Sequence, residues 1–273
     1  MSFITRKVVN KKFVYTSARQ EDLERIKKLK IPPMWINVKI NPSSKSKLQA
    51  TGYDSKGRKQ YIYHKNFIEK SKTNKFNKMN SFDYSKYSRV IRHHISQKDL
   101  SRECVIANAL KIMEDLNIRV GNENYKKQNG TFGITTLLKK HLKGNKLEFI
   151  GKKAIAHSKS ITNPISLDFI SRVLKINSPQ LFCDSTGYNI TSSDLNSFLK
   201  EKVQSNITCK DIRTYCANKI FKTFMNKLKR GITEKDRKNN IIKGVDYTAN
   251  ELGNTRKVCR DSYLCPDVIA KYS

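Results

Sequence analysis

The residue types that could do chemistry in this chain gather around a tyrosine near its carboxyl end. Tyr263 lies in the run Leu252-Gly-Asn-Thr-Arg-Lys-Val-Cys-Arg-Asp-Ser-Tyr-Leu-Cys-Pro266, and two arginines and a lysine lie upstream in distinct sequence settings. A tyrosine can attack phosphorus and conserve the bond energy in a phosphotyrosine. Arginines can stabilise charge on the phosphate oxygens, and a desolvated lysine can protonate the leaving oxygen. Together these residue types supply the nucleophile, the charge stabilisation and the acid that cleavage of a phosphodiester without a metal requires.

The charge balance indicates a polyanion as the partner. The 273 residues include 55 Lys and Arg against 23 Asp and Glu, which gives a formal net charge of +32. Such a charge repels itself in a compact protein, and its usual purpose is to bind phosphates with release of counterions. Because the basic residues are spread over the whole chain, they suit a protein that wraps duplex DNA. Charge alone does not separate an enzyme from a ribosomal or nucleoid-like binder.

Several other classes of site lack their sequence signals. We find no phosphate-binding Gly-x-x-x-x-Gly-Lys-Ser/Thr loop, no Gly-x-Ser-x-Gly elbow and no cluster of closely spaced carboxylates for metals. The six cysteines form no CxxC pair, so we predict no metal site, no cofactor and reduced thiols. Without an apolar N-terminal region or a run of eighteen apolar residues, we predict an intracellular protein that does not contact the membrane.

The sequence pattern predicts an α+β protein with two domains, divided between residues 72 and 73. Residues 1–72 are expected to form a small β-rich lobe. Apolar and polar residues alternate over 35–40 and again over 58–63, on either side of turn residues 53–57. A capping pattern at 17–20 predicts one short helix that the prolines after residue 31 stop.

Residues 73–273 are expected to form a larger, mainly helical catalytic domain with a short β insertion over 131–158. Residues 65–82 are rich in lysine and asparagine, and we interpret them as a helix end plus linker. Val105 to Leu116 show a helical apolar stripe. Thr208-Cys-Lys-Asp211 is a capping box that opens a helix to Arg230, ended by Gly231. Its predicted buried stripe comprises Ile212, Cys216, Ile220 and Phe224.

Six segments, in their order and spacing, resemble the type IB DNA topoisomerases of the small poxvirus-like class over nearly all of the chain. They are Lys30-Ile-Pro-Pro-Met-Trp35, Ala50-Thr-Gly-Tyr-Asp-Ser-Lys-Gly-Arg-Lys-Gln-Tyr-Ile-Tyr-His64, Ile118-Arg-Val-Gly121, Phe149-Ile-Gly-Lys152, Lys210-Asp-Ile-Arg-Thr-Tyr215 and the Tyr263 run. The resemblance implies the fold shared by tyrosine recombinases and these topoisomerases, and relaxation of supercoiled duplex DNA without ATP or metal. It also implies a monomer. If the protein is viral, we expect it in the host cytoplasm and the virion.

The resemblance further implies a role for each matching residue. Arg119 and Arg213 would stabilise the transition state, and Lys152, on a hairpin turn, would be the general acid. Lys210 would assist proton transfer one helical turn before Arg213, and Tyr263 would form the 3′-phosphotyrosine. The implied DNA contacts are Lys56, Arg58, Gln60, Tyr61 and Tyr63 on the N-terminal hairpin, and Tyr125 and Thr136 near the DNA backbone.

Two positions depart from the family pattern. Asn254 stands where a histidine usually donates to a phosphate oxygen; an amide can donate the same hydrogen bond but carries no charge. Lys153 stands where an acidic residue often follows the lysine, and its charge should favour the neutral form of Lys152. Two other interpretations stay open: a tyrosine recombinase, which shares these residue types, and a basic DNA-binding protein without catalysis.

Overall fold

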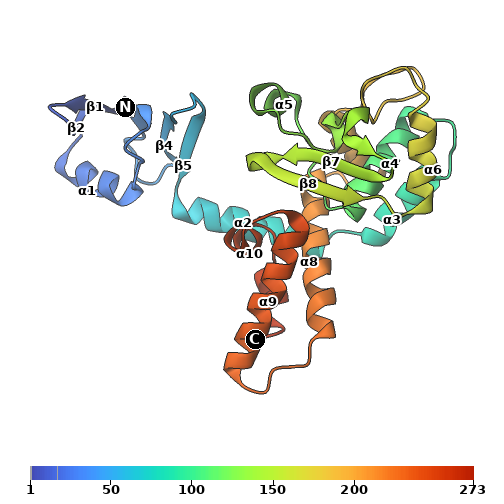
Figure 1. The fold of residues 1–273 in the computed structure, drawn as a ribbon. Coiled ribbons are helices and arrows are strands. Elements are labelled where there is room, and N and C mark those ends of the chain that lie inside the picture. Colours follow the sequence, from blue (N-terminus) through green and yellow to red (C-terminus); the bar gives the residue numbers. More distant parts are fainter. Residues whose placement is uncertain (1, 17) are drawn as a thin grey trace. The chain divides into compact units, whose positions relative to one another are not determined.

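The computed structural model describes residues 2–16 and 18–273, and these divide into two compact units, Met1–Lys78 and Met79–Ser273 (Figure 1). The boundary expected between residues 72 and 73 falls inside α2 (Lys65–Asn80), close to the end of the first unit. The fold is α+β, as predicted, with a β-rich first unit and a mainly helical second unit.

The first unit is built on one antiparallel sheet with the strand order β2-β1-β3-β4-β5. The bounds are β1 (Ile4–Val9), β2 (Lys12–Thr16), β3 (Ile36–Ile40), β4 (Leu48–Tyr53) and β5 (Lys59–Tyr63). The strands predicted from alternation correspond to β3 and β5, and the turn at 53–57 joins β4 to β5. The first two strands, β1 and β2, were not predicted, because lysines lie among their apolar residues and most of their side chains are exposed.

The short helix α1 (Gln20–Leu29) covers this sheet through the buried Ile26. The predicted cap at Ser17 lies outside the described residues. The helix begins after Arg19, whose backbone N–H donates to Asp22 at 3.2 Å. It ends at Lys30 in the left-handed conformation, ahead of the prolines.

The segment that we interpreted as a helix end plus linker is one continuous helix, α2. Its poor apolar periodicity led to the wrong prediction of a linker where the structure has a helix. The segment contains neither glycine nor proline, and lysine is a good helix former, so nothing in it interrupts the helical hydrogen bonds.

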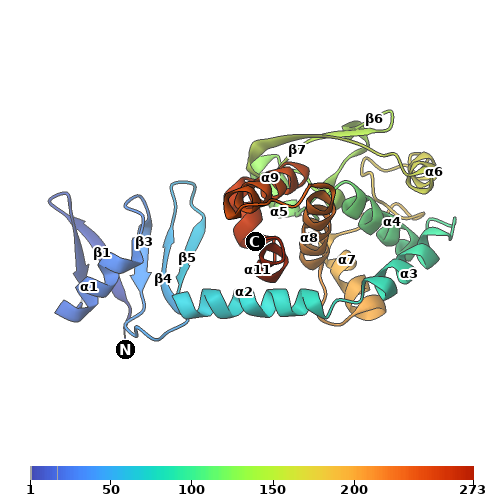
Figure 2. The same ribbon diagram turned by 90° about the horizontal axis from the view of Figure 1, so that it is seen from below.

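In the second unit a small sheet lies on one side of a group of packed helices (Figures 1 and 2). Its helices are α3 (Tyr84–Ile95), α4 (Arg102–Asp115), α5 (Glu123–Asn129), α6 (Pro164–Val173), α7 (Ser192–Phe198), α8 (Cys209–Lys227), α9 (Glu234–Leu252), α10 (Arg256–Ser262) and α11 (Pro266–Ala270). The strands β6 (Leu142–Lys143), β7 (Lys146–Gly151) and β8 (Ile155–Ser160) form the predicted β insertion in the order β6-β7-β8. α4 lies at the centre, with Val105, Ala109 and Ile112 fully buried.

α8 begins as predicted, with Thr208 and Asp211 forming a reciprocal capping box. It ends at Lys227, because Leu228 turns into extended backbone before Gly231 is reached. Phe221 and Met225 are buried, while the predicted Ile220 and Phe224 are only half-buried. A four-residue step overshoots the helical repeat by about 40°, so a stripe drawn at that spacing drifts around the helix.

α8 and α9 run side by side and extend away from the rest of the second unit (Figure 1). Phe221, Met225 and Val245 form the centre of a second apolar cluster between them. Tyr263 and α11 pack against the same cluster, so the carboxyl-terminal segment is held on α8.

Candidate active site

Arg119 lies in a loop after α4 that is fixed by close backbone packing. The N–H of Ile134 donates to the Arg119 carbonyl at 2.8 Å, and the N–H of Thr135 donates to Val120 at 2.9 Å. A Cβ on Gly133 would lie 2.5 Å from the Arg119 carbonyl oxygen, so only glycine permits this approach. Thr136 is buried, and its hydroxyl accepts from the Gly133 N–H at 2.9 Å. Thr136 therefore supports the Arg119 loop, and its contact with the DNA backbone stays a prediction.

Arg213 projects from the first turns of α8 into the interior and is 6% exposed. Its two terminal nitrogens donate to the carbonyl oxygens of Asn117 and Leu252. Burial, and then the charge of Arg119, lower the pKa of Arg213 to about 10, so it is still a cation at neutral pH. These bonds join the loop after α4, the start of α8 and the end of α9 at one guanidinium.

Tyr263 ends α10 with its ring 5.7 Å from the Arg213 guanidinium carbon, measured to the ring centre. The Asn218 side chain holds the backbone from Tyr263 to Cys265. Asn218 Nδ2 donates to the Tyr263 carbonyl at 2.8 Å, and Oδ1 accepts from the Cys265 N–H at 2.9 Å. Sequence reasoning missed Asn218; its one signal was a polar amide, a poor helix former, among the apolar residues of a long helix.

The electrostatics of this cluster favour an ionised phenol. Burial opposes loss of the Tyr263 proton, but the charges of Arg213 and Arg119, a hydrogen bond with Arg213 and the charge of Lys210 outweigh it. The pKa of Tyr263 is therefore lowered from its usual value of 10.0. Lys210, exposed near the start of α8, acts here through its charge.

Asn254 lies just after α9 and contacts the second arginine. Arg119 Nη2 donates to Asn254 Oδ1, which defines the orientation of the amide. Within the described part of the chain, the buried Asn254 Nδ2 has no hydrogen-bond partner. Because an unpaired buried donor is costly, this amide group is a candidate donor to a ligand.

His157 on β8 is a further neighbour of the site that the sequence did not indicate. Its ring stacks on Phe149, with 5.0 Å between ring centres. A Cβ on Gly151 would lie 2.6 Å from this ring, and one on Gly253 would lie 2.8 Å from it. Burial, followed by the charges of Arg119, Lys159 and Arg213, lowers its pKa to about 4. His157 is therefore a neutral spacer between the hairpin and the Asn254 turn.

Lys152 lies in the turn between β7 and β8, as predicted, and is exposed. Its ammonium group is 5.9 Å from the ring centre of Tyr125, which projects from α5 and is 53% exposed. The structure therefore brings together the tyrosine and the two arginines, whereas the lysine lies at the hairpin turn beside Tyr125.

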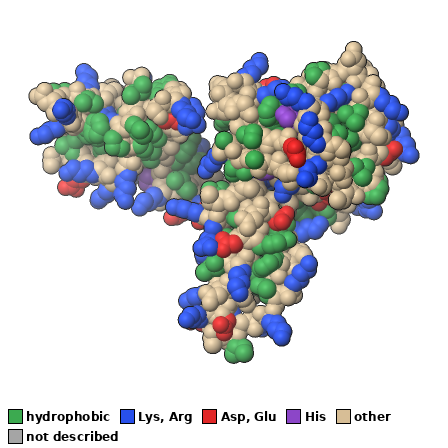
Figure 3. All heavy atoms as spheres, viewed as in Figure 1, with side chains coloured by type: hydrophobic (Ala, Val, Ile, Leu, Met, Phe, Trp, Pro, Cys, Tyr) green, Lys and Arg blue, Asp and Glu red, His purple; other side chains and the backbone are tan. Residues whose placement is uncertain are grey.

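The predicted major-groove residues lie on or beside the β4–β5 hairpin. Lys56 and Arg58 are exposed in its turn. Tyr61 and Tyr63 are exposed on one face of β5 with stacked rings, 6.2 Å between centres. Gln60 alternates to the other face and donates to Asp54 at 3.0 Å. Lys and Arg side chains are scattered over the visible face of each unit without forming a single patch (Figure 3).

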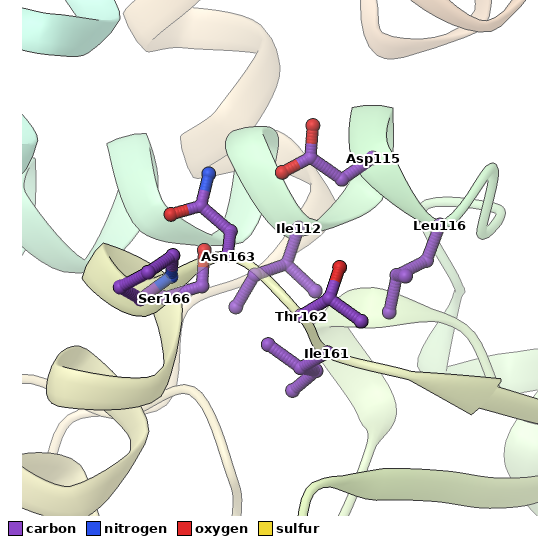
Figure 4. A pocket seen from close by; sticks show the side chains of 8 residues that line it. Ile112, Asp115, Leu116, Ile161, Thr162, Asn163 and Ser166 are labelled. Atoms are coloured by element: carbon purple, nitrogen blue, oxygen red, sulfur yellow. The ribbon is translucent and has the colours of Figure 1, made fainter.

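The described residues contain neither a metal-binding group of three or more His, Cys, Asp or Glu nor a helix that could cross a membrane. One pocket of about 450 Å³ lies between the end of α4 and the start of α6 (Figure 4). Ile112, Asp115 and Asn163 are among its lining residues, and no predicted site residue lines it.

Two family models and several known proteins match this chain over most of its length. The family model of the eukaryotic DNA topoisomerase I catalytic core matches residues 64–272, and that of the bacterial DNA topoisomerase IB N-terminal domain matches residues 14–54. DNA topoisomerase 1B of Acanthamoeba polyphaga mimivirus is 33% identical over 287 residues, covering 97% of this chain and 85% of that protein.

More distant relatives agree with these matches. DNA topoisomerase 1B of vaccinia virus (strain Copenhagen) is 25% identical, covering 82% of this chain and 72% of that protein. DNA topoisomerase 1 of rabbit fibroma virus is 26% identical, covering 90% and 80%. A structure of a lambda integrase dimer bound to a COC′ core site aligns with a TM-score of 0.40 and 9% identity, over 69% of this chain and 56% of that chain. That similarity is too weak to decide fold or function.

Proposed function

This chain belongs to the type IB DNA topoisomerase family, and on that premise we propose that it relaxes supercoiled duplex DNA with Tyr263 as the nucleophile. The observation that carries the assignment of Tyr263 is its contact with Arg213, beside Arg119, at a phenol whose pKa is lowered. A C-terminal tyrosine that served only packing would not need two converging arginines.

The reaction exchanges one phosphodiester for another. The Tyr263 oxygen bonds to the scissile phosphorus as its phenolic proton passes to water, and the bond from phosphorus to the 5′ oxygen breaks, so that this oxygen leaves as a hydroxyl after it takes a proton. Arg119 and Arg213 donate to the non-bridging oxygens, where negative charge grows. The broken strand then swivels, and its 5′-hydroxyl attacks the phosphotyrosine to reseal the strand. The linkage retains the bond energy, so we propose that neither ATP nor metal enters these steps.

Lys152 is the proposed acid for the leaving 5′ oxygen. Its exposed place on a hairpin turn, beside Tyr125, would let it reach a DNA strand lying over Arg119 and Arg213. Lys210 assists by its positive charge. Asn254 replaces the usual histidine, because Arg119 fixes its carbonyl and leaves its NH2 to donate to a phosphate oxygen.

We further propose that the two units hold opposite sides of a duplex. The β4–β5 hairpin would enter the major groove with Lys56, Arg58, Gln60, Tyr61 and Tyr63, and Tyr125 and Thr136 would lie by the DNA backbone. The protein would act as a monomer without contact to a membrane. Because the relatives are viral, we propose a viral protein of the host cytoplasm and virion.

The decisive experiment is relaxation of a supercoiled plasmid in the presence of a chelator and without nucleotide. Wild-type protein should give relaxed circles and, after denaturation, a covalent protein–DNA adduct. Tyr263→Phe should give neither and still bind DNA. Tyr247→Phe, at a 43% exposed tyrosine on α9, is the matched control and should relax normally.

Three results would overturn the proposal. An active Tyr263→Phe would remove Tyr263 as the nucleophile. Binding without any adduct from the wild type would make the protein a non-catalytic binder. Product formed only from substrates with two paired sites would indicate a recombinase.

A further inference from the structure

One carboxylate in the β4–β5 turn holds two of the proposed DNA-contacting side chains. Asp54 Oδ2 accepts from Arg58 Nε at 2.8 Å and from Gln60 Nε2 at 3.0 Å. Arg58 Nη2 lies 2.7 Å from the same oxygen. The other oxygen, Oδ1, accepts from the backbone N–H groups of Lys56 and Arg58, both at 3.0 Å. Oδ1 therefore accepts the hydrogen bonds that stabilise the turn, and Oδ2 accepts those that hold the Arg58 and Gln60 side chains.

This contact determines which way the Gln60 amide faces. An amide accepts at its oxygen and donates from its nitrogen, whereas a carboxylate only accepts. The hydrogen bond with Arg58 is the largest influence that lowers the pKa of Asp54, to about 2, so the carboxylate stays ionised at neutral pH. Nε2 must then face Asp54, which leaves Oε1 and the second N–H of Gln60 for a ligand.

We propose that Asp54 is a positioning residue for base readout, which holds Gln60 so that an acceptor and a donor face the major groove side by side. In the major groove, adenine presents the complementary pair, its N6 amino group and N7. The inference rests on the proposed function, because it takes this hairpin as the element that reads DNA. It names the base edge selected and the residue that enforces the selection.

The variant Asp54→Asn separates readout from folding of the turn. Its oxygen can keep both backbone hydrogen bonds, while its NH2 replaces Oδ2 and cannot accept from Gln60. If Asp54 only stabilises the turn, Asp54→Asn should change the sequence preference of cleavage little. If Asp54 acts through Gln60, the variant should lose discrimination between bases at one base pair and keep it at the other positions.

The test measures the sequence preference of covalent cleavage. A duplex library randomised around the cleavage site is incubated with wild type, Gln60→Ala, Asp54→Asn and the double variant, and the bound strands are sequenced. Wild type should prefer adenine at one position. Each single variant should lose roughly tenfold of that preference, within the range of one bidentate base contact. The double variant should match Gln60→Ala, because Asp54 acts through Gln60.

The matched control is Asp99→Asn, which removes the same charge from a turn of the second unit, where Asp99 accepts from the Ser101 N–H at 3.0 Å. It should keep the preference. An unchanged preference in Asp54→Asn, or losses that add in the double variant, would overturn the proposal. If Asp54→Asn does not fold by circular dichroism, Asp54→Ser replaces it.

The proposed function can fail independently of this inference. If wild type forms no covalent adduct, the nucleophile assignment fails. The same library is then selected for binding to Tyr263→Phe with and without Asp54→Asn. Preference for adenine that depends on Asp54 would still support the inference, and its absence would reject it.

Discussion

The side chain of Asn218 holds the backbone of Tyr263 from a helix 45 residues earlier in the sequence. Its Nδ2 donates to the Tyr263 carbonyl at 2.8 Å, and its Oδ1 accepts from the Cys265 N–H at 2.9 Å. Asn218 is on the same helix as Arg213, so one rigid element carries the proposed transition-state arginine and the support of the proposed nucleophile. Catalysis depends on such positions, because a misplacement of about 1 Å can cost roughly 100-fold in rate.

Asn218→Ala should therefore slow covalent cleavage by roughly 10- to 100-fold. It should also lower the free energy of unfolding by about 1–3 kcal/mol, because the buried Cys265 N–H and the half-buried Tyr263 carbonyl lose this hydrogen-bond partner. Single-turnover adduct formation and thermal unfolding measure the two effects. Asn226→Ala is the control on the same helix, since the Asn226 side chain accepts a solvent-exposed hydrogen bond from the Tyr272 hydroxyl at 2.7 Å. A cleavage rate equal to wild type would show that α10 holds Tyr263 without Asn218.

Asn254→His should retain most of the cleavage rate, and Asn254→Ala should reduce it by about tenfold or more. Both Asn and His can donate to a phosphate oxygen, whereas Ala leaves Arg119 without its side-chain partner. The measurement is single-turnover cleavage at saturating DNA. Equal rates for all three forms would remove Asn254 from the site.

The Tyr263 phenol should ionise at a lower pH than an ordinary tyrosine. The positive charges around it stabilise the phenolate more than burial destabilises it. Subtracting the alkaline absorbance titration of Tyr263→Phe from that of wild type isolates this phenol. The difference should rise below pH 10, and Lys210→Gln should move it to higher pH. A Tyr263 midpoint at or above the ordinary tyrosine value of 10.0 contradicts the arrangement.

His157 should make the protein less stable in mild acid. Its pKa falls from 6.5 to about 4 on folding, so between these values the unfolded chain binds a proton that the folded chain does not. The free energy of unfolding is therefore unaffected by protonation of His157 above about pH 6.5, and it falls as the pH is lowered from 6.5 towards 4. After allowance for solvent screening, the loss is about 1 kcal/mol.

Chemical unfolding of wild type and His157→Phe at pH 7 and pH 4.5 tests this effect. The phenyl ring keeps the stacking on Phe149 but does not titrate, so the variant should lose less stability between the two pH values. His93→Gln, at an exposed histidine of α3, should behave as wild type. Equal losses in wild type and His157→Phe would exclude His157 as the source.

DNA binding should weaken steeply with salt. If six to ten phosphates are contacted, log affinity against log salt should have a slope of about −5 to −9. Fluorescence anisotropy with a labelled duplex and Tyr263→Phe measures binding without cleavage. A slope near zero would contradict a binding mode dominated by phosphates.

The sequence alone determined the features that depend on near neighbours or on the order of segments. The Thr208–Asp211 capping box is correct because its partners are three residues apart. The β5 strand is correct because alternation is a local pattern, and the order of the six segments identified the family. The local pattern gave a wrong prediction at α2: weak apolar periodicity indicated a linker, but the segment has no glycine or proline to interrupt a helix.

The tertiary structure alone decided which distant groups meet. Arg119 contacts Asn254 across 135 positions, and Arg213 bonds to the carbonyl oxygens of Asn117 and Leu252, which no side-chain pattern could reveal. Asn218 and His157 became visible only once the helices and the hairpin had packed. Such contacts depend on where α8, α9 and the hairpin converge, and that is set by burial of apolar surface throughout the unit.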